Sequence, residues 1–173
     1  MDTLTPQQRH TVMSHIRSNN TVPELTVRSA LFRLGFRFRK NDRRYSGTPD
    51  IVFPHYHAVI FVNGCFFHGH AIKEQTSITS TYSNGGLAAT YSRGHCKLSR
   101  LPKTNTEYWR NKIERNKQRD KEDAQKLMND LWRVGVVWEC SITGKNRAQK
   151  IRNVAEEISL WLEEEFDEPY KEF

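Results

Sequence analysis

The chain has 173 residues, enough for one domain with a substantial core. Its 36% hydrophobic and 27% charged residues exclude a disordered chain, and no apolar run is long enough to span a membrane. The net charge of +7 favours a polyanionic partner. The first residues lack the basic start and apolar stretch of a secretory signal, so we expect a cytoplasmic protein.

The charge is unevenly distributed along the chain. Residues 1–45 carry nine Lys and Arg against three acidic residues, and residues 97–121 carry the same numbers. Residues 150–173 reverse the balance, with three basic residues and eight acidic ones. We therefore expect the first two-thirds of the fold to hold the polyanion. Ordinary solvated helix faces would explain the charge alone equally well.

Helical patterns dominate the first 35 residues. Thr5 and Pro6 are typical of the N-cap and first position of a short helix, about 5–18. A second helix follows, with Glu24 in its first turn and Gly35 at its end. The apolar residues expected inside this second helix are Leu25, Leu31 and Leu34.

Strand patterns occupy residues 36–62. Residues 36–39 alternate in the manner of an edge strand. Residues 50–53 and 58–62 are two β-rich runs joined by a short turn, which predicts a hairpin in the middle of a sheet. Residues 64–105 show no clear regular structure, and a loop of this length is usually functional or disordered.

The second half predicts a long helix over about 106–131, a short buried strand over 134–138, and an amphipathic helix over about 147–165. The order of helices and strands favours an α/β fold, in which helices flank a mixed central sheet on both sides. We expect a single domain over residues 1–173.

Two polar residues, Asn116 and Asp120, interrupt the inward face of the long helix. A buried polar group costs about 1–3 kcal/mol unless it is paired, and these two lie one turn apart. A satisfied core hydrogen bond would explain them, but we favour a polar site where the helix crosses the sheet. The other residues of this face are Trp109, Ile113, Ala124, Leu127 and Leu131.

Asp50 begins one of the central strands, directly after Pro49. Asp is disfavoured in strands, so its place at the head of an apolar run needs a reason. A carboxylate there could hold a hard cation such as Mg²⁺. The Pro-Asp dipeptide is also common in ordinary turns.

Residues 65–70 contain a cysteine, two aromatic residues and two histidines. Cys65 and His70 could share a zinc ion with Cys96 and Cys140, and such a closed Cys₃His site would be structural. The alternative is a set of inert thiols. An odd number of cysteines in a cytosolic chain argues against a disulfide framework.

The other three residues of this segment are candidates for chemistry and recognition. His68 lies close to Asp50 if the two strands are neighbours, and it could serve as a general base, although a lone histidine more often packs or is solvated. Phe66 and Phe67 could wedge between stacked bases if they are exposed, or belong to the core if they are buried.

Together these segments resemble the very-short-patch mismatch repair endonucleases, the Vsr family. The resemblance covers nearly the whole chain up to about residue 145, in order. The most specific part is Gly-Cys-Phe-aromatic-His-x-His at a strand end, followed by Pro-x-Thr-x-Thr-Glu-aromatic-Trp and Val-Trp-Glu-Cys. The matching segments are residues 13–16, 24, 47–50, 59–70, 102–109, 116–120 and 136–140.

The resemblance implies a fold related to that of type II restriction endonucleases. It implies a bacterial enzyme that nicks one strand of double-stranded DNA 5′ to the thymine of a T·G mismatch. Such mismatches arise when 5-methylcytosine deaminates, and the nick starts very-short-patch repair. We expect a monomer, with proteins of the repair pathway as further partners.

The resemblance also implies roles for the polar residues. Asp50 would bind Mg²⁺ through its carboxylate and Val62 through its backbone carbonyl, with two ions bridged through Asp50. The family position at Val62 is often Thr, but a carbonyl ligand tolerates the change. His68 would be the general base and Asp120 would orient it. Two further site residues are implied: Asn116 on a water or phosphate at the metal, and Glu24 reaching in from the second helix.

The same resemblance assigns the remaining candidates. One structural Zn²⁺ would be held by Cys65, His70, Cys96 and Cys140. Four apolar side chains would insert beside the mismatch, namely Phe66, Phe67, Met13 and Ile16.

The chain departs from the family pattern at two places. The second aromatic residue, usually Trp, is Phe67. Residues 71–94 also separate His70 from Cys96, where the family usually has a spacing of two, so His95 becomes a rival zinc ligand. Closing a longer loop costs only ~0.6 kcal/mol per doubling of its length, so the zinc site can survive.

Two other functions fit the residues. One is an endonuclease of related fold that cuts matched DNA at a fixed sequence. The other is a non-catalytic zinc module that binds DNA, but such a binder has no need for inward-facing Asn116 and Asp120.

Overall fold

The computed structural model describes residues 5, 7, 8, 11, 14, 19–70, 96–164 and 168–173. Its centre is a mixed four-stranded sheet in the order β1-β2-β3-β4, in which β1 is antiparallel to β2, and β3 is parallel to β2 and β4. The predicted hairpin and the predicted α/β fold are confirmed. The strands are β1 (Ile51–Phe53), β2 (Ala58–Asn63), β3 (Arg133–Trp138) and β4 (Tyr170–Glu172).

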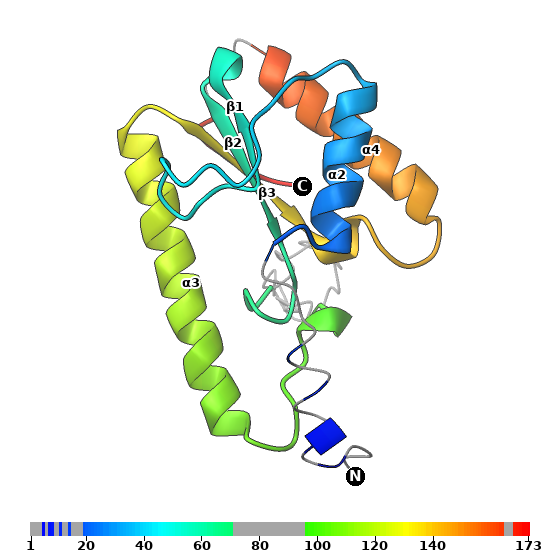
Figure 1. The fold of residues 1–173 in the computed structure, drawn as a ribbon, viewed down its shortest axis with the longest axis vertical. Coiled ribbons are helices and arrows are strands. Elements are labelled where there is room, and N and C mark those ends of the chain that lie inside the picture. The colour runs from blue at the N-terminus through cyan, green and yellow to red at the C-terminus, as the bar shows by residue number, and fades with distance from the viewer. Residues whose placement is uncertain are drawn as a thin grey trace, which may run out of the picture.

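Three long helices flank the sheet: α2 (Val22–Arg33), α3 (Thr106–Asn129) and α4 (Arg147–Glu163). In Figure 1, α2 and α4 lie side by side on one side of the sheet, and α3 runs alone along the other side. The described residues also include three short 3₁₀ helices: η1 (Pro54–Tyr56), η2 (Lys97–Ser99) and η3 (Glu139–Ser141). None of the described helices combines the length and the apolar character that crossing a membrane requires.

The strands supply two separate cores because successive side chains point to opposite faces of a sheet. On the face towards α2 and α4, Ile51, Phe53 and Ile60 pack with Leu31 and Ile158. On the face towards α3, a smaller cluster contains Val52, Val59, Val134, Ala124 and Leu127. Each fully buried Val, Leu, Ile or Phe side chain contributes about 1.5–3 kcal/mol to the free energy of folding. The helices therefore hold the sheet from both sides.

The end of the chain packs onto the sheet at Gly135. A Cβ atom at this position would lie 3.1 Å from the Phe173 ring and 3.4 Å from the Trp161 ring. The missing side chain therefore leaves room for both rings against β3, and it allows β4 to pair at the sheet edge. This fourth strand was not expected from the acidic sequence after residue 163.

Some expectations about burial and strands are wrong. Leu25 and Leu34 are about half exposed because α2 turns Val27 and Leu31 to the core instead. Leu131 is 83% exposed, since α3 ends two residues earlier and the backbone at Leu131 has a φ of 62°. The edge strand expected at 36–39 is a single bridge between Arg39 and Val52, so β1 lies at the sheet edge rather than in its middle.

At the N-terminus, Thr5 and Gln8 form a reciprocal capping pair, as expected for a helix beginning there. The Thr5 hydroxyl accepts from the Gln8 backbone N–H at 3.2 Å, and the Gln8 side chain accepts from the Thr5 N–H at 2.8 Å. Met13 and Ile16 lie outside the described residues, as do His95 and the segment 71–94.

Candidate active site and metal centre

A cleft of about 1200 Å³ lies between the sheet and α3. Residues far apart in the sequence meet there, because the start of α2, the ends of β2 and β3 and one side of α3 all border it. It brings together most of the residues expected at the site: Glu24, Asp50, Val62, Phe67, His68 and Asp120.

Asp50 lines the cleft and lies directly before β1. Its Oδ2 accepts a hydrogen bond of 2.8 Å from the backbone N–H of Val62 in β2. The N–H and C=O of one strand residue point to the same side, so the Val62 carbonyl is directed towards the Asp50 side as well. Burial, together with the charge of nearby Glu24, raises the pKa of Asp50 to about 7 against the lowering effects of the Val62 hydrogen bond and of Arg28.

Glu24 reaches the same place from the first turn of α2, where it is 4% exposed. Its carboxylate accepts from the backbone N–H and the hydroxyl of Thr21, at 3.3 and 2.7 Å, and from the N–H of Asn20 at 2.8 Å. Thr21 and Glu24 together form the capping box that starts the helix. The same side chain therefore begins α2 and lines the cleft.

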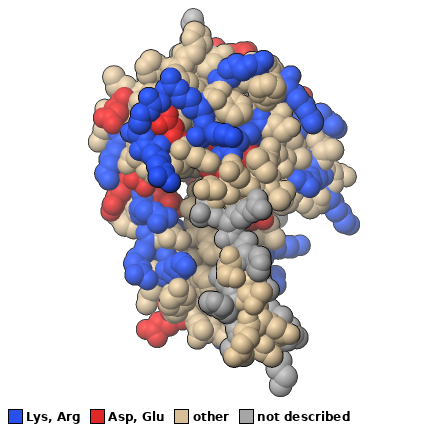
Figure 2. All heavy atoms as spheres, viewed as in Figure 1, with Lys and Arg blue, Asp and Glu red and all other residues tan. Residues whose placement is uncertain are grey.

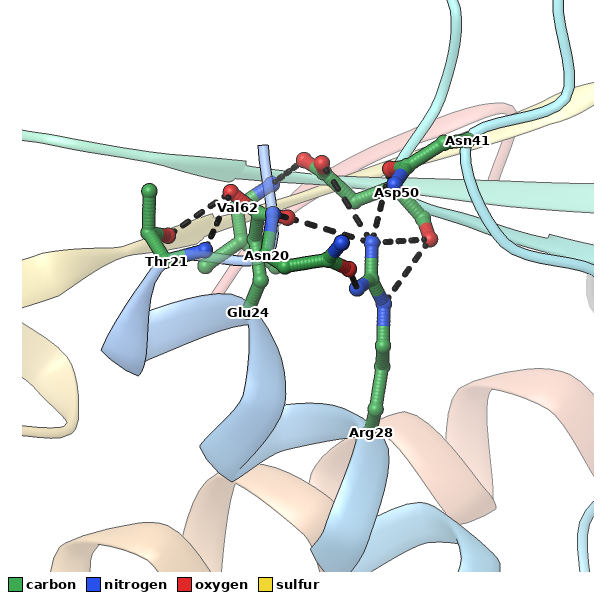
Figure 3. A network of polar contacts seen from close by, with 7 residues as sticks. All are labelled: Asn20, Thr21, Glu24, Arg28, Asn41, Asp50 and Val62. Carbon is green, nitrogen blue, oxygen red and sulfur yellow. Dashed lines mark hydrogen bonds and ion pairs between the residues drawn. The ribbon is translucent and has the colours of Figure 1, made fainter. Parts of the chain in front are cut away.

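Arg28, one turn further along α2, connects these groups and was missed in the sequence analysis (Figure 3). It is 6% exposed. Its Nη2 donates to Glu24 Oε2 at 3.1 Å, and both Nη2 and Nε donate to the Asp50 carbonyl at 3.0 and 3.2 Å. The available signal was the spacing of four between Glu24 and Arg28 inside a capped helix, which places the two side chains on one face.

His68 and Asp120 lie on opposite sides of the cleft. His68 Nδ1 is 2.5 Å from Asp120 Oδ2. His68 is presented by a tight turn in which Gly69 has a φ of 60°, and a Cβ at Gly69 would lie 2.6 Å from the Ile113 side chain. Only glycine allows this turn to approach α3 so closely.

Asn116 lies one turn before Asp120 and holds the same segment. Its Nδ2 donates to the Phe67 backbone carbonyl at 2.8 Å, so consecutive residues of the turn are bound by the two polar residues of α3. Asn116 is not among the residues that line the cleft. Its side-chain amide already donates to this backbone carbonyl. The expected contact of Asn116 with a phosphate or water at the metal stays a prediction.

A second cluster adjoins the cleft. Each of its four residues offers one ligand atom, and these atoms lie within 4.8 Å of one another. His70 Nδ1 is 3.5 Å from Cys65 Sγ and 3.3 Å from Cys140 Sγ. Ligands at about 2.0–2.3 Å from a tetrahedral zinc lie roughly 3.3–3.8 Å apart, so these two distances fit the ion. The cluster consists of Cys65, His70, Cys96 and Cys140, as expected from the sequence.

Burial sets the protonation of this cluster. It raises the pKa of the Cys65 and Cys140 thiols, and it lowers the pKa of His70, which keeps the imidazole neutral. The His70 ring also stacks on Trp138, with ring centres 4.1 Å apart and planes 8° apart. A neutral ring in a fixed plane is suited to metal ligation.

Phe66 and Phe67 are half-buried, neither in the core nor fully exposed. Their ring centres lie 5.0 and 6.3 Å from that of Trp109, at the start of α3. Phe67 also lines the cleft. Trp109 therefore packs against both rings, whereas the sequence pattern places it only on the inward face of the helix.

Basic side chains border the cleft. Lys117, Arg119 and Lys121 of α3 are exposed and line it, and Arg39, Lys40 and Arg43 are exposed on the loop before β1. Figure 2 shows Lys and Arg side chains over this loop and along α3 on one face of the molecule. This distribution agrees with the basic stretches noted in the sequence.

Comparison with known proteins places these features in context. A sequence model of the family described as DNA mismatch endonuclease Vsr matches residues 1–74. The type II nicking enzyme V.XorIIP of Xanthomonas oryzae pv. oryzae is 38% identical over 154 residues, covering 88% of this chain and 96% of the relative. The type II nicking enzyme V.NmeAIP of Neisseria meningitidis is 37% identical over 160 residues, or 91% and 96% of the two chains. DNA mismatch endonuclease Vsr of Escherichia coli K12 is 32% identical over 150 residues, or 87% and 80%.

Proposed function

Because the chain belongs to the Vsr family of DNA mismatch endonucleases, it is a DNA endonuclease, and we propose that it nicks one strand 5′ to the thymine of a T·G mismatch. Such a mismatch is the product of 5-methylcytosine deamination, and the nick would start very-short-patch repair. The convergence of Asp50, Glu24, His68 and Asp120 on one cleft supports the proposal most strongly. The relatives named as nicking enzymes support a cut in a single strand.

Mg²⁺ suits the oxygen donors of the cleft. The Asp50 carboxylate and the Val62 carbonyl would hold it, with Glu24 close by, and we expect two ions at this site. When bound, magnesium would neutralise charge on the phosphate and stabilise the attacking and leaving oxygens. The hydrogen bond from the Val62 N–H keeps Asp50 Oδ2 in place, and that restraint limits the orientations of the carboxylate.

His68 would act as the general base. In this proposal His68 Nδ1 would donate to the Asp120 carboxylate across the 2.5 Å contact, because a carboxylate oxygen is an acceptor. The lone pair of the neutral ring is then on Nε2, which can take a proton from the attacking water. Asp120 holds the ring in this tautomer and stabilises the imidazolium that forms. The water oxygen would bond to phosphorus as the bond to the 3′ oxygen breaks. That oxygen would take a proton from solvent, which leaves a 3′-hydroxyl and a 5′-phosphate.

The Cys₃His cluster would hold one structural zinc ion. It would tie the turn after β2 to the segment before α3 and to η3, because its residues come from all three. His68 lies between the ligands Cys65 and His70 in sequence. A zinc there would therefore also restrain the general base.

Recognition of the mismatch would involve the aromatic pair and the basic border. Phe66 and Phe67 would stack beside the mismatched bases, with Met13 and Ile16 inserted from the N-terminal helix. Lys117, Arg119 and Lys121 would contact phosphates along the rim of the cleft. We expect the enzyme to act as a monomer in the bacterial cytoplasm, with repair-pathway proteins as partners.

The test is a nicking assay in Mg²⁺ on duplexes that differ only at one base pair, with the cut positions mapped. The proposal expects one cut, 5′ to the T, in the T·G duplex and little cutting of the T·A duplex. Equal cutting of both would instead identify an endonuclease for matched DNA. Family membership argues against the non-catalytic zinc module.

A further inference from the structure

The Arg28 guanidinium contacts four groups, two from the start of its own helix and two from the segment before β1 (Figure 3). Besides Glu24 and the Asp50 carbonyl, it donates from Nη1 to Asn20 Oδ1 at 2.8 Å and from Nη2 to Asn41 Oδ1 at 2.7 Å. An arginine offers five N–H donors in a fixed plane, so contacts to this many acceptors fix the direction of each one.

Asp50 is held at two points by this arrangement. Its backbone carbonyl accepts from Arg28 Nε and Nη2, and its Oδ1 lies 3.8 Å from Nη2. Its other carboxylate oxygen accepts from Val62, so both the main chain and the side chain of Asp50 have fixed partners.

Glu24 Oε2 lies 3.1 Å from the same Nη2, so a single nitrogen stands between two carboxylates. The side chains of Arg28 and Glu24 are only 7% and 5% exposed. Two carboxylates this close repel each other in a poorly hydrated site, and the guanidinium offsets one of the two negative charges. Arg28 therefore sets both the local charge and the positions of the two carboxylates.

We propose that Arg28 is a positioning residue for the catalytic metal site. Its guanidinium holds Asp50 and Glu24 in their metal-binding arrangement before the ion arrives. This inference rests on the proposed function of Asp50 as a magnesium ligand. The physical basis is preorganisation: ligands that are already oriented by their own partners lose less freedom when the ion binds.

Two effects of Arg28 on metal binding have opposite signs, and this makes the proposal testable. If the guanidinium acted only through its charge, its removal would tighten cation binding, because a positive neighbour would be lost. If it acts by positioning, its removal weakens binding. Partners of metal ligands typically contribute about 10–100-fold to metal affinity.

The variants are Arg28→Met and Arg28→Lys, with Arg33→Met, an exposed arginine of the same helix, as the control. Mn²⁺ binding is measured by calorimetry on the zinc-containing protein in complex with an already nicked duplex, which cannot be cut again.

We expect both Arg28 variants to bind Mn²⁺ at least about tenfold more weakly than the wild type. Lys keeps the charge but not the fork, so it should not restore binding. The Mg²⁺ concentration for half-maximal nicking should rise in parallel, with DNA affinity unchanged.

A milder variant keeps the test decisive if loss of Arg28 unfolds the chain. Asn41→Ala removes one acceptor of the guanidinium and leaves the Glu24–Arg28 pair intact. It should weaken Mn²⁺ binding severalfold, while Arg33→Met leaves it unchanged. Wild-type or tighter Mn²⁺ binding in folded Asn41→Ala or Arg28→Met protein, or full restoration by Lys, would overturn the inference. A wild-type protein that does not nick the T·G duplex would instead overturn the proposed function.

Discussion

His68 Nδ1 and Asp120 Oδ2 lie 2.5 Å apart although the two residues are 52 positions apart in the sequence. One comes from the turn after β2 and the other from the middle of α3, so the contact exists only because the helix packs across the sheet. It connects the two sides of the cleft at the residue proposed as the general base. The first prediction concerns this pair.

We expect His68→Ala to lower the nicking rate by at least about 100-fold, since it would remove the proposed general base. Asp120→Asn should lower the rate comparably, because an amide can donate to Nδ1 and favour the wrong tautomer. Both variants should still bind the mismatched duplex. The measurements are single-turnover nicking and binding by gel shift, with Glu122→Gln, an exposed carboxylate of α3, as the control. Near-normal nicking by His68→Ala would remove its assignment as the base.

A second prediction follows from the pKa of Asp50, which burial raises to about 7. Without Mg²⁺, the folded protein keeps this proton between about pH 4 and 7 while the unfolded chain has lost it. The contribution of Asp50 to stability is therefore complete below pH 4 and is lost as the pH rises through 7. Its ionisation should cost roughly 2–4 kcal/mol of folding free energy at pH 8.

Asp50→Asn should therefore stabilise the magnesium-free protein at pH 8, and much less at pH 5. Urea unfolding at the two pH values measures the difference. Added Mg²⁺ should make the wild type more stable to urea than Asp50→Asn at pH 8, since only the wild type has the carboxylate ligand. An equal effect of the substitution at both pH values would show that Asp50 is not protonated in the folded protein.

A third prediction concerns the zinc. We expect one zinc ion per chain by elemental analysis, and its loss in Cys140→Ser and His70→Ala. Because structural zinc contributes directly to folding, both variants should melt more than about 10 °C lower. His55→Ala, at an exposed histidine, is the matched control and should keep the ion. Retention of zinc by Cys96→Ser together with its loss from His95→Ala would assign the fourth ligand to His95 instead.

A fourth prediction concerns mismatch recognition. Phe67→Ala should weaken binding of the T·G duplex by about 1–3 kcal/mol, the usual contribution of one stacked aromatic ring. Matched DNA should be affected less, since a mismatched step costs less to unstack. Fluorescence anisotropy with both duplexes measures this, and Tyr108→Ala, at an exposed ring beside Trp109, is the control. Equal losses for the two duplexes would assign the discrimination to other residues.

Local sequence patterns were enough for α2, α3 and α4, for the hairpin and for the candidate Cys₃His cluster. Helix α3 begins at the predicted Thr106, and the four residues expected around zinc do meet, even with a long insertion before Cys96. The helices and the hairpin depend on periodicity and turn residues, which are visible in a short window, whereas the cluster was inferred from the chemistry of Cys and His along the whole chain. The resemblance to a family supplied the roles that such patterns leave open.

Only the tertiary structure decided which faces are buried and which polar groups meet. Leu25 and Leu34 are apolar but exposed, while Glu24 and Arg28 of the same helix are buried. That reversal has a physical cause: the Asp50 carbonyl, Asn41 and Asn20 satisfy the Arg28 donors, and these acceptors arrive from other segments. Whether a charge can be buried depends on partners brought by the fold, and periodicity along one helix does not contain that information.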